Sequence, residues 1–222
     1  MLIRLDERLS AIAKLVDYGT VADVGCDHGK LGFYLLGTDR ASKIIATDIS
    51  EGSLQKASRL AFENDLDMET RLGDGLAPVA DGEADTVVIA GLGGDVISEI
   101  LIRARADGKK FANYVLSPNT HPEKVRKELA EQGHKIVFDD VIECAGKRYT
   151  LIKSQTGSGY LDELQIAFGA FYKENTSFLK SAKEELEYKE NILKEHFSPE
   201  LEKRVSMLKA AIIKAEEGYE NI

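Results

Sequence analysis

The stretch VADVGCDHGKLG, residues 21–32, decides the fold of this chain. An apolar run over residues 21–24 leads into a turn that holds Gly25 and Gly29, and a second apolar segment covers residues 31–36. This order predicts a strand, a glycine turn and a helix. A glycine turn after a first parallel strand lets a ligand lie against the backbone, because glycine has no Cβ atom. The helix after it offers unpaired N–H groups and a positive dipole end.

The composition is that of a globular protein of moderate size. The chain has 222 residues, of which 43% are hydrophobic and 30% charged, enough for one α/β domain with an appendage. It has no apolar run of membrane-spanning length, and its start, MLIRLDERLS, lacks the pattern of a signal peptide. Cys26 and Cys144 form neither a disulfide framework nor a set of zinc ligands, so we expect a cytoplasmic protein without a metal site. The lack of a spanning apolar run predicts no membrane contact. The net charge of -9 argues against a general nucleic-acid binder but allows a local basic face.

Strand and helix patterns alternate from residue 21 to about residue 133. Apolar runs predict strands over residues 21–24 and 85–90, and further strands are predicted over residues 43–48, 68–72 and 113–116. Helical spacing occurs over residues 1–18 and in the segments between the later strands, with Ser50 or Ser53 as a cap before residue 54 and Pro122 in the first turn of a helix over residues 123–131. This alternation predicts an α/β fold with a doubly wound, Rossmann-like parallel sheet. Residues 135–143 and 148–153 predict a hairpin, which would place one antiparallel strand at or near the sheet edge.

The pattern changes at QTGSG, residues 155–159, which is a flexible linker by composition. From Tyr160 onward the apolar residues recur at helical steps, which predicts two or three helices, the last two forming an antiparallel, coiled-coil-like hairpin. The sequence therefore predicts a doubly wound domain over residues 1–155 and a C-terminal helical domain over residues 160–222.

Acids and glycines occur at four predicted strand ends, where a doubly wound sheet binds its ligand. Asp23 lies in the first strand, two residues before Gly25. Asp48 ends the second strand, where a carboxylate can accept both ribose hydroxyls of an adenosine, and Asp74 follows the third, where it could accept the adenine amino group. The fourth strand runs into three glycines that would let substrate and cofactor approach the backbone: Gly91, Gly93 and Gly94.

Asp27 decides which nucleotide cofactor fits this turn. The dinucleotide fingerprint G-x-G-x-x-G lacks its middle glycine here, and Asp27 puts a negative charge where a pyrophosphate would lie. S-adenosylmethionine carries an amine and a sulfonium beside an adenosine, so a carboxylate would favour it. The turn and the three acids therefore favour S-adenosylmethionine over NAD.

Each of these residues also has a simpler interpretation. Asp74-Gly75 is a common turn pair, Asp23 could bond only to turn backbone, and Gly93-Gly94 could serve tight packing. His28 could be an ordinary loop histidine without metal partners, and both cysteines could be packed thiols. The functional interpretation is favoured because these features fall at successive strand ends of one fold.

The segments DVGCDHGKLG, TDIS, GDGL, IAGLGG and SPNTH, in this order and spacing, resemble the bacterial tRNA (adenine-N1)-methyltransferases that modify adenine 22. The resemblance runs from Arg8-Leu9 to about Lys153, with Leu92 in place of the family's methionine and Ser117 in place of its glutamine. It implies a class I methyltransferase sheet, S-adenosylmethionine as methyl donor, and a helical C-terminal domain that helps to engage tRNA.

The resemblance also implies roles for individual residues. Asp23, Gly25, Asp27 and His28 would form the cofactor loop, with Asp48 at the ribose, Asp74 and Gly75 at the adenine, and Gly91, Gly93 and Gly94 between cofactor and target. The target-base pocket would be lined by Ser117, Pro118 and Asn119, with His121 nearby and Asn119 at the base edge.

Basic residues near the predicted substrate loops suggest a phosphate-binding rim for tRNA: Arg4, Arg8, Lys124, Arg126 and Arg148. The C-terminal helices are acidic on balance, so they would engage tRNA by shape or through a few lysines such as Lys173, Lys180 and Lys183, or serve as a dimerisation or stability hairpin. We expect a monomer or weak dimer. The alternatives are a small-molecule methyltransferase, a non-catalytic protein that binds S-adenosylmethionine as a regulator or scaffold, and, least favoured, an NAD-dependent dehydrogenase.

Overall fold

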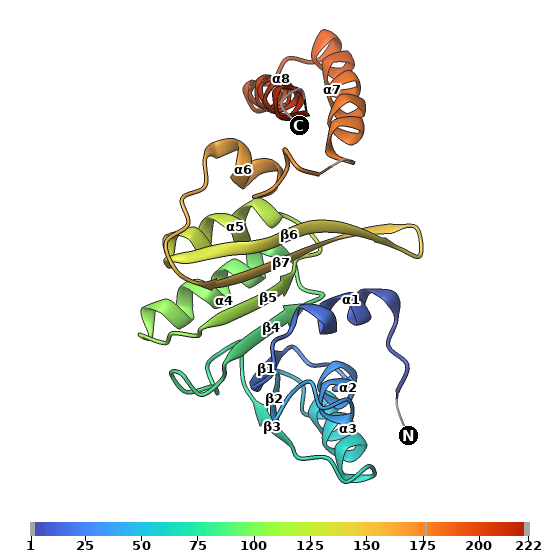
Figure 1. The fold of residues 1–222 in the computed structure, drawn as a ribbon, viewed down its shortest axis with the longest axis vertical. Helices are drawn as coiled ribbons and strands as arrows, with labels where there is room; N and C mark the ends of the chain where they lie inside the picture. The colour runs from blue at the N-terminus through green and yellow to red at the C-terminus, as the bar shows by residue number, and fades with distance from the viewer. Residues whose placement is uncertain (1–2, 176, 220–222) are drawn as a thin grey trace. The chain divides into compact units, whose positions relative to one another are not determined.

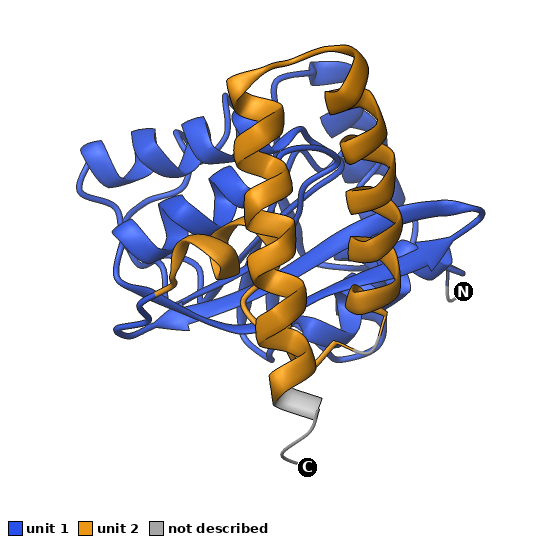
Figure 2. Cartoon of the chain, turned by 90° about the horizontal axis from the view of Figure 1, so that it is seen from above, with its two compact units in different colours: residues 1–160 blue, residues 161–222 orange. Residues whose placement is uncertain are grey.

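The computed structural model describes residues 3–175 and 177–219 and is shown as a ribbon in Figure 1. The chain divides into two compact units, residues 1–160 and 161–222, coloured separately in Figure 2. Each unit has a hydrophobic core of its own and is described by itself below.

The first unit is built on a seven-stranded sheet with the strand order β3-β2-β1-β4-β5-β7-β6. β1 to β5 are parallel neighbours, whereas β7 runs antiparallel to both β5 and β6. The prediction of a doubly wound sheet with one antiparallel strand is therefore confirmed. The strands are β1 (Thr20–Val24), β2 (Lys43–Asp48), β3 (Met68–Leu72), β4 (Thr86–Ala90), β5 (Asn113–Ser117), β6 (His134–Cys144) and β7 (Lys147–Thr156).

Five helices cover the two faces of this sheet. In Figure 1, α1, α2 and α3 lie on one side, and α4 and α5 lie on the other. The first group packs Ile12 and Leu35 against Ile44, Val88 and Val115 of the strands, all of them buried. The helices are α1 (Glu7–Leu15), α2 (Lys30–Gly37), α3 (Glu51–Phe62), α4 (Gly94–Ala106) and α5 (Pro122–Glu131).

Local capping explains where the helices begin. α1 begins at Glu7 rather than at residue 1, because the Asp6 carboxylate accepts a hydrogen bond from the Leu9 N–H at 2.7 Å and so caps the helix. Residues 1 and 2 of the predicted first helix lie outside the described residues. Ser50 caps α3, and Pro122 occupies the first turn of α5, both as predicted.

The predicted linker starts later than the sequence suggested. Gln155 pairs with Asn113 of β5, and the Thr156 N–H donates to the Ala112 carbonyl at 2.8 Å. These two residues therefore belong to β7. Although their side chains are polar and a glycine follows, their backbone groups still pair with the chain at β5.

The second unit contains α6 (Glu163–Phe168), α7 (Phe178–Glu195) and α8 (Pro199–Tyr219). Ion pairs Lys183–Glu216 and Lys209–Glu190 join the first half of α7 to the end of α8 and the end of α7 to the middle of α8, so the two helices are antiparallel. Its core consists of residues from all three helices and the α6–α7 segment: Leu164, Tyr172, Phe178, Ala182, Leu208, Ala211, Ile212 and Ala215.

Candidate active site

The turn after β1 is built by backbone hydrogen bonds to β2. The N–H groups of Gly25 and Cys26 both donate to the Thr47 carbonyl, at 2.8 and 3.1 Å. Gly25 has a φ of 71°, a conformation in which an L side chain is strained, and its missing Cβ would meet nothing nearer than Leu92 at 3.8 Å. The turn therefore leaves open space directly over the Gly25 backbone, at the centre of the sheet.

Asp23 lies just behind this turn as a buried acid. The residue is 6% exposed, and its Oδ2 has no hydrogen-bond partner among the described residues. Burial raises the pKa of Asp23 to about 7, the nearby Asp48 charge adds to this, and a hydrogen bond from the Gly32 backbone opposes it. A buried oxygen without a partner is unfavourable, so Asp23 suits a ligand that brings an amine or another cation.

Asp48 connects the turn after β1 with the end of β2. Oδ2 accepts from the Asp27 N–H at 3.0 Å, and Oδ1 accepts from the Ser50 N–H at 2.9 Å. The carboxylate is half-buried and each oxygen keeps a second lone pair, which is what two ribose hydroxyls would require.

Asp74, after β3, forms a bidentate ion pair with Arg103 of α4. The distances are 2.5 Å from Nη1 to Oδ2 and 3.1 Å from Nη2 to Oδ1. The Arg103 guanidinium holds the pKa of Asp74 below its usual value. The pair is exposed, so an adenine amino group can share or displace the guanidinium at modest cost.

The loops after β4 and β5 are tied together at Asn119. Its Nδ2 donates to the Gly91 carbonyl at 2.7 Å, and its backbone N–H donates to the Leu92 carbonyl at 2.8 Å. With Nδ2 engaged, the exposed amide presents Oδ1 as an acceptor. Ser117 and Pro118, also predicted for the target pocket, are buried, and within the described part of the chain the Ser117 hydroxyl has no hydrogen-bond partner.

Tight packing requires glycine at position 94, apart from any role in ligand binding. The Gly94 N–H donates to the Thr120 carbonyl at 2.8 Å, and a Cβ atom there would overlap the carbonyl oxygens of Thr120 and His121. At Gly93 a Cβ atom would lie 3.2 Å from the Thr120 hydroxyl. The α4 N-terminus can therefore approach the loop after β5 only with glycine in this position.

Asp27 and His28, both predicted for the cofactor loop, are partly or largely exposed in the turn after β1. The Asp27 side chain is 75% exposed and 3.7 Å from His28 Nδ1, and the other ring nitrogen of His28 is 2.9 Å from Lys56 Nζ on α3. Lys56 thus joins Asp27 and His28 in one charged group that no sequence motif indicates.

Arg8 lies inside the strand-end site. Its guanidinium is 5.3 Å from the centre of the Tyr149 ring, and Nη1 lies 3.3 Å from where a Cβ atom on Gly91 would be. Arg148 is exposed on β7, and Lys124 forms an ion pair with Asp95.

The interpretation of Arg126 as a phosphate-binding residue is wrong. Its side chain is 4% exposed and forms an ion pair with Asp139, whose side chain is 1% exposed, at 2.7 Å from Nε to Oδ2. A guanidinium buried against its own carboxylate cannot reach a phosphate, so this pair is structural.

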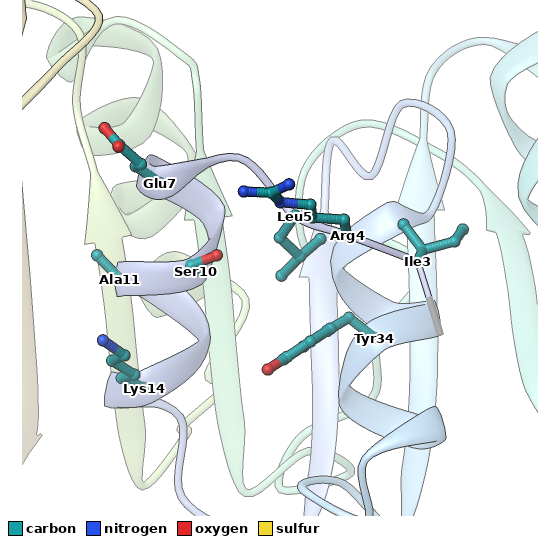
Figure 3. Close-up of a pocket in the computed structure, with 8 residues that line it drawn as sticks. All are labelled: Ile3, Arg4, Leu5, Glu7, Ser10, Ala11, Lys14 and Tyr34. Carbon is teal, nitrogen blue, oxygen red and sulfur yellow. The ribbon is translucent and has the colours of Figure 1, made fainter. Parts of the chain in front are cut away.

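A separate pocket of about 550 Å³ lies beside α1 (Figure 3). It is lined by the segment before α1, by α1 and by Tyr34 of α2. Arg4 belongs to this lining, whereas none of the predicted cofactor residues does.

Within residues 3–175 and 177–219, none of the helices combines the length and the apolar character that a membrane span needs. No group of three or more His, Cys, Asp or Glu side chains in the same residues is arranged to hold a metal ion.

Comparison with known proteins first defines the class. Residues 5–152 match the family model of the methyltransferase domain. The matched part contains α1, β1 to β6 and most of β7, and with them the acids at β1 and β2 and the glycine turn.

Individual relatives narrow the class. The tRNA (adenine(22)-N(1))-methyltransferase of Bacillus subtilis is 29% identical over 201 residues, which are 86% of this chain and 84% of the relative. The crystal structure of the B. subtilis m1A22 tRNA methyltransferase TrmK has a TM-score of 0.81 and 27% identity, over 97% of this chain and 98% of that one. TrmK of M. capricolum, in complex with S-adenosylhomocysteine, has a TM-score of 0.84 and 27% identity, over 95% and 99%. The chain belongs to the bacterial tRNA (adenine(22)-N1)-methyltransferase family.

Proposed function

We propose that the chain transfers a methyl group from S-adenosylmethionine to N1 of adenine 22 in tRNA. The observation that carries this proposal is the unpaired, buried Oδ2 of Asp23, behind the open Gly25 turn and beside Asp48. A cationic amine next to an adenosine satisfies both acids, and the relatives named above are tRNA methyltransferases.

The chain's own groups fit this cofactor at three points. Asp23 would accept from the amine, Asp48 from the ribose hydroxyls, and Asp74 with Gly75 would flank the adenine. When bound, S-adenosylmethionine supplies a methyl group activated by its sulfonium. Gly91 and Gly93 would let the methyl donor and the target base meet over bare backbone.

Asn119 would orient the target adenine. With Nδ2 held by the Gly91 carbonyl, Oδ1 can accept from the adenine amino group, which fixes the neighbouring N1 atom toward the methyl group. Adenine N1 has an available lone pair, so the reaction needs positioning rather than a strong base. The product ring is cationic, and the Asn119 and Gly91 carbonyl oxygens would stabilise the developing charge. A stacked target base must be flipped out to reach this pocket.

The remaining parts would bind the rest of the tRNA. Residues 1–155 would form the cofactor-binding domain, with Arg4, Arg8, Lys124 and Arg148 toward RNA, and the helical domain over residues 160–222 would help to engage the tRNA. Lys124 would have to exchange Asp95 for a phosphate. We further propose that the protein acts in the cytoplasm as a monomer or weak dimer.

The test is methyl transfer from labelled S-adenosylmethionine to unmodified tRNA transcripts, with the product nucleoside identified. We expect N1-methyladenosine, and we expect it to disappear when adenine 22 is replaced. Binding of S-adenosylmethionine without tRNA methylation would point instead to a small-molecule substrate or a non-catalytic role. A thermal shift by NAD but not by S-adenosylmethionine would overturn the cofactor assignment.

A further inference from the structure

The pocket beside α1 is a feature of the first unit that the proposed reaction leaves unused. Its volume of about 550 Å³ lies within the range of ordinary ligand sites. Ile3 and Leu5 supply apolar wall, Arg4 and Lys14 supply cations, and Tyr34 supplies an aromatic ring with a hydroxyl. This mixture of apolar, aromatic and cationic groups is suited to one nucleotide.

The cations of this pocket are free, unlike others on the same unit. Within residues 3–175 and 177–219, Arg4 and Lys14 have no acidic partner, whereas Lys124 is paired with Asp95 and Arg103 with Asp74. Glu7 is the acid among the lining residues, so the two cations of the lining face one carboxylate. The lining therefore keeps a net positive charge on a chain of net charge -9, which makes it a local site for an anion.

Tyr34 and Ser10 add free hydroxyl groups. In the described part of the chain neither hydroxyl has a hydrogen-bond partner, although both residues line the pocket. Figure 3 shows the Tyr34 phenol oxygen pointing toward α1 and the Arg4 side chain extending toward the same helix. Cations for phosphate, together with an aromatic ring and hydroxyls for base and ribose, are the usual elements of a single-stranded RNA contact.

The pocket and the strand-end site share α1. Glu7, Ser10, Ala11 and Lys14 follow one another at helical steps along the pocket, while Arg8 places its guanidinium beside Gly91. A helix with its side chains is about 10–12 Å across, so adjacent nucleotides of one strand can occupy both places.

We propose that this pocket binds a nucleotide of the tRNA strand next to the methylated adenine, with its phosphate at Arg4 and Lys14 and its base or ribose at Tyr34. The proposal rests on the proposed function and extends it by a second subsite on the same RNA. Arg4 would then contact the phosphate of one particular nucleotide, rather than belong only to a general basic rim.

The test compares the full chain with Arg4→Gln/Lys14→Gln and with Tyr34→Phe, using tRNA binding and steady-state methylation. For the double variant we expect at least tenfold weaker tRNA binding. The slope of log affinity against log salt should become shallower by about 0.7 for each lost phosphate contact. Tyr34→Phe removes one hydroxyl and should raise KM for tRNA about 2–10-fold. The Kd for S-adenosylmethionine and kcat at saturating tRNA should stay within about twofold.

The matched control is Arg59→Gln/Lys110→Gln, which removes one arginine and one lysine from exposed positions outside this pocket. Equal loss of tRNA affinity and of salt slope in both double variants would mean a general charge effect and would overturn the subsite. Wild-type affinity in the pocket variants would overturn it too. If the wild-type chain binds tRNA but methylates none, the proposed function fails while the binding data still judge the pocket. If the wild-type chain binds no tRNA, the proposed function and the pocket proposal are both overturned.

Discussion

Asp23 links the protonation of one residue to the stability of the fold. Its pKa of about 7 lies above the ordinary value of 3.8, so the folded chain binds a proton that the unfolded chain releases between these pH values. The neutral form is therefore the one that the fold tolerates. Stability contributed by this group is lost as the pH rises through that window.

Asp23→Asn should remove this pH dependence. Because a shift of about three pKa units corresponds to at most about 4 kcal/mol, the free energy of unfolding of the variant should gain up to that amount over the wild type between pH 4 and pH 8. Urea denaturation across this range measures it, with the exposed Asp67→Asn as control. Parallel stability curves for the wild type and Asp23→Asn would contradict the burial argument.

The same carboxyl should make cofactor binding dependent on pH. A cationic ligand binds the ionised form better, so the Kd for S-adenosylmethionine should fall between pH 5.5 and 7.5, by at most about tenfold per pH unit below the pKa. Calorimetric titration at several pH values measures this. An equally steep dependence in Asp23→Asn would mean that another group is responsible.

Asn119→Ala should lower kcat far more than it changes the Kd for S-adenosylmethionine. The side chain would orient the target base, and misplacement by about 1 Å can reduce the rate about a hundredfold. Single-turnover methylation of tRNA, with cofactor binding measured separately, distinguishes the two effects. Equal loss of both would place Asn119 in the cofactor site instead.

Single charges were the least predictable part of the site. The sequence shows Arg126 as a basic residue on a predicted helix. It cannot show that Asp139, thirteen residues further on, forms a buried ion pair with it. Arg103 and Asp74 are 29 residues apart and meet only because α4 packs beside the loop after β3. By contrast, the positions of Asp23, Asp48 and the glycines at strand ends followed from the chain order, because parallel strands bring their carboxyl ends together.

At the scale of elements, the strands were the most predictable part of the fold. The second strand, Lys43–Asp48, and the third, Met68–Leu72, have the predicted bounds. The second is a mostly buried parallel strand whose apolar run ends at polar residues, and the third ends directly before Gly73. The start of α1 was wrong by six residues, since a capping aspartate outweighs apolar spacing.

Gly94→Ala should damage the junction between α4 and the loop after β5. The new methyl group overlaps two carbonyl oxygens, and we expect a loss of about 1–3 kcal/mol in the free energy of unfolding, as for an overpacked core. Gly37→Ala, at the end of α2 with nothing within 4 Å of its Cβ position, is the matched control and should be neutral or slightly stabilising. Similar values for the two variants in chemical denaturation would refute the packing role.

At the scale of the whole molecule, most of the basic residues of the helical unit already have acidic partners. Of the lysines considered for RNA contact, Lys183 pairs with Glu216 and Lys173 lies 6.0 Å from the centre of the Tyr172 ring. Further pairs within the unit are Lys203–Glu163, Lys209–Glu190, Lys214–Asp162 and Arg204–Glu185. Any contribution of this unit to tRNA binding would therefore depend on shape more than on charge.

Removal of residues 161–222 tests that contribution. The first unit has its own core, so we expect residues 1–160 to keep the Kd for S-adenosylmethionine within about threefold, while kcat/KM for tRNA falls at least tenfold. Circular dichroism and urea denaturation verify that the shortened chain is folded. Unchanged tRNA kinetics would assign the helical unit to stability or dimerisation.

The strand order has a consequence for how such a protein can diversify. From β1 the chain moves outward to β2 and β3, then returns to β4 beside β1 and moves outward on the other side. The proposed donor-binding acids thus lie before residue 75, and the loops proposed for the target base lie after residue 90. Mutations that change the target base therefore fall in a different part of the gene from the acids that hold the methyl donor, so one ancestral scaffold can acquire new methylation targets.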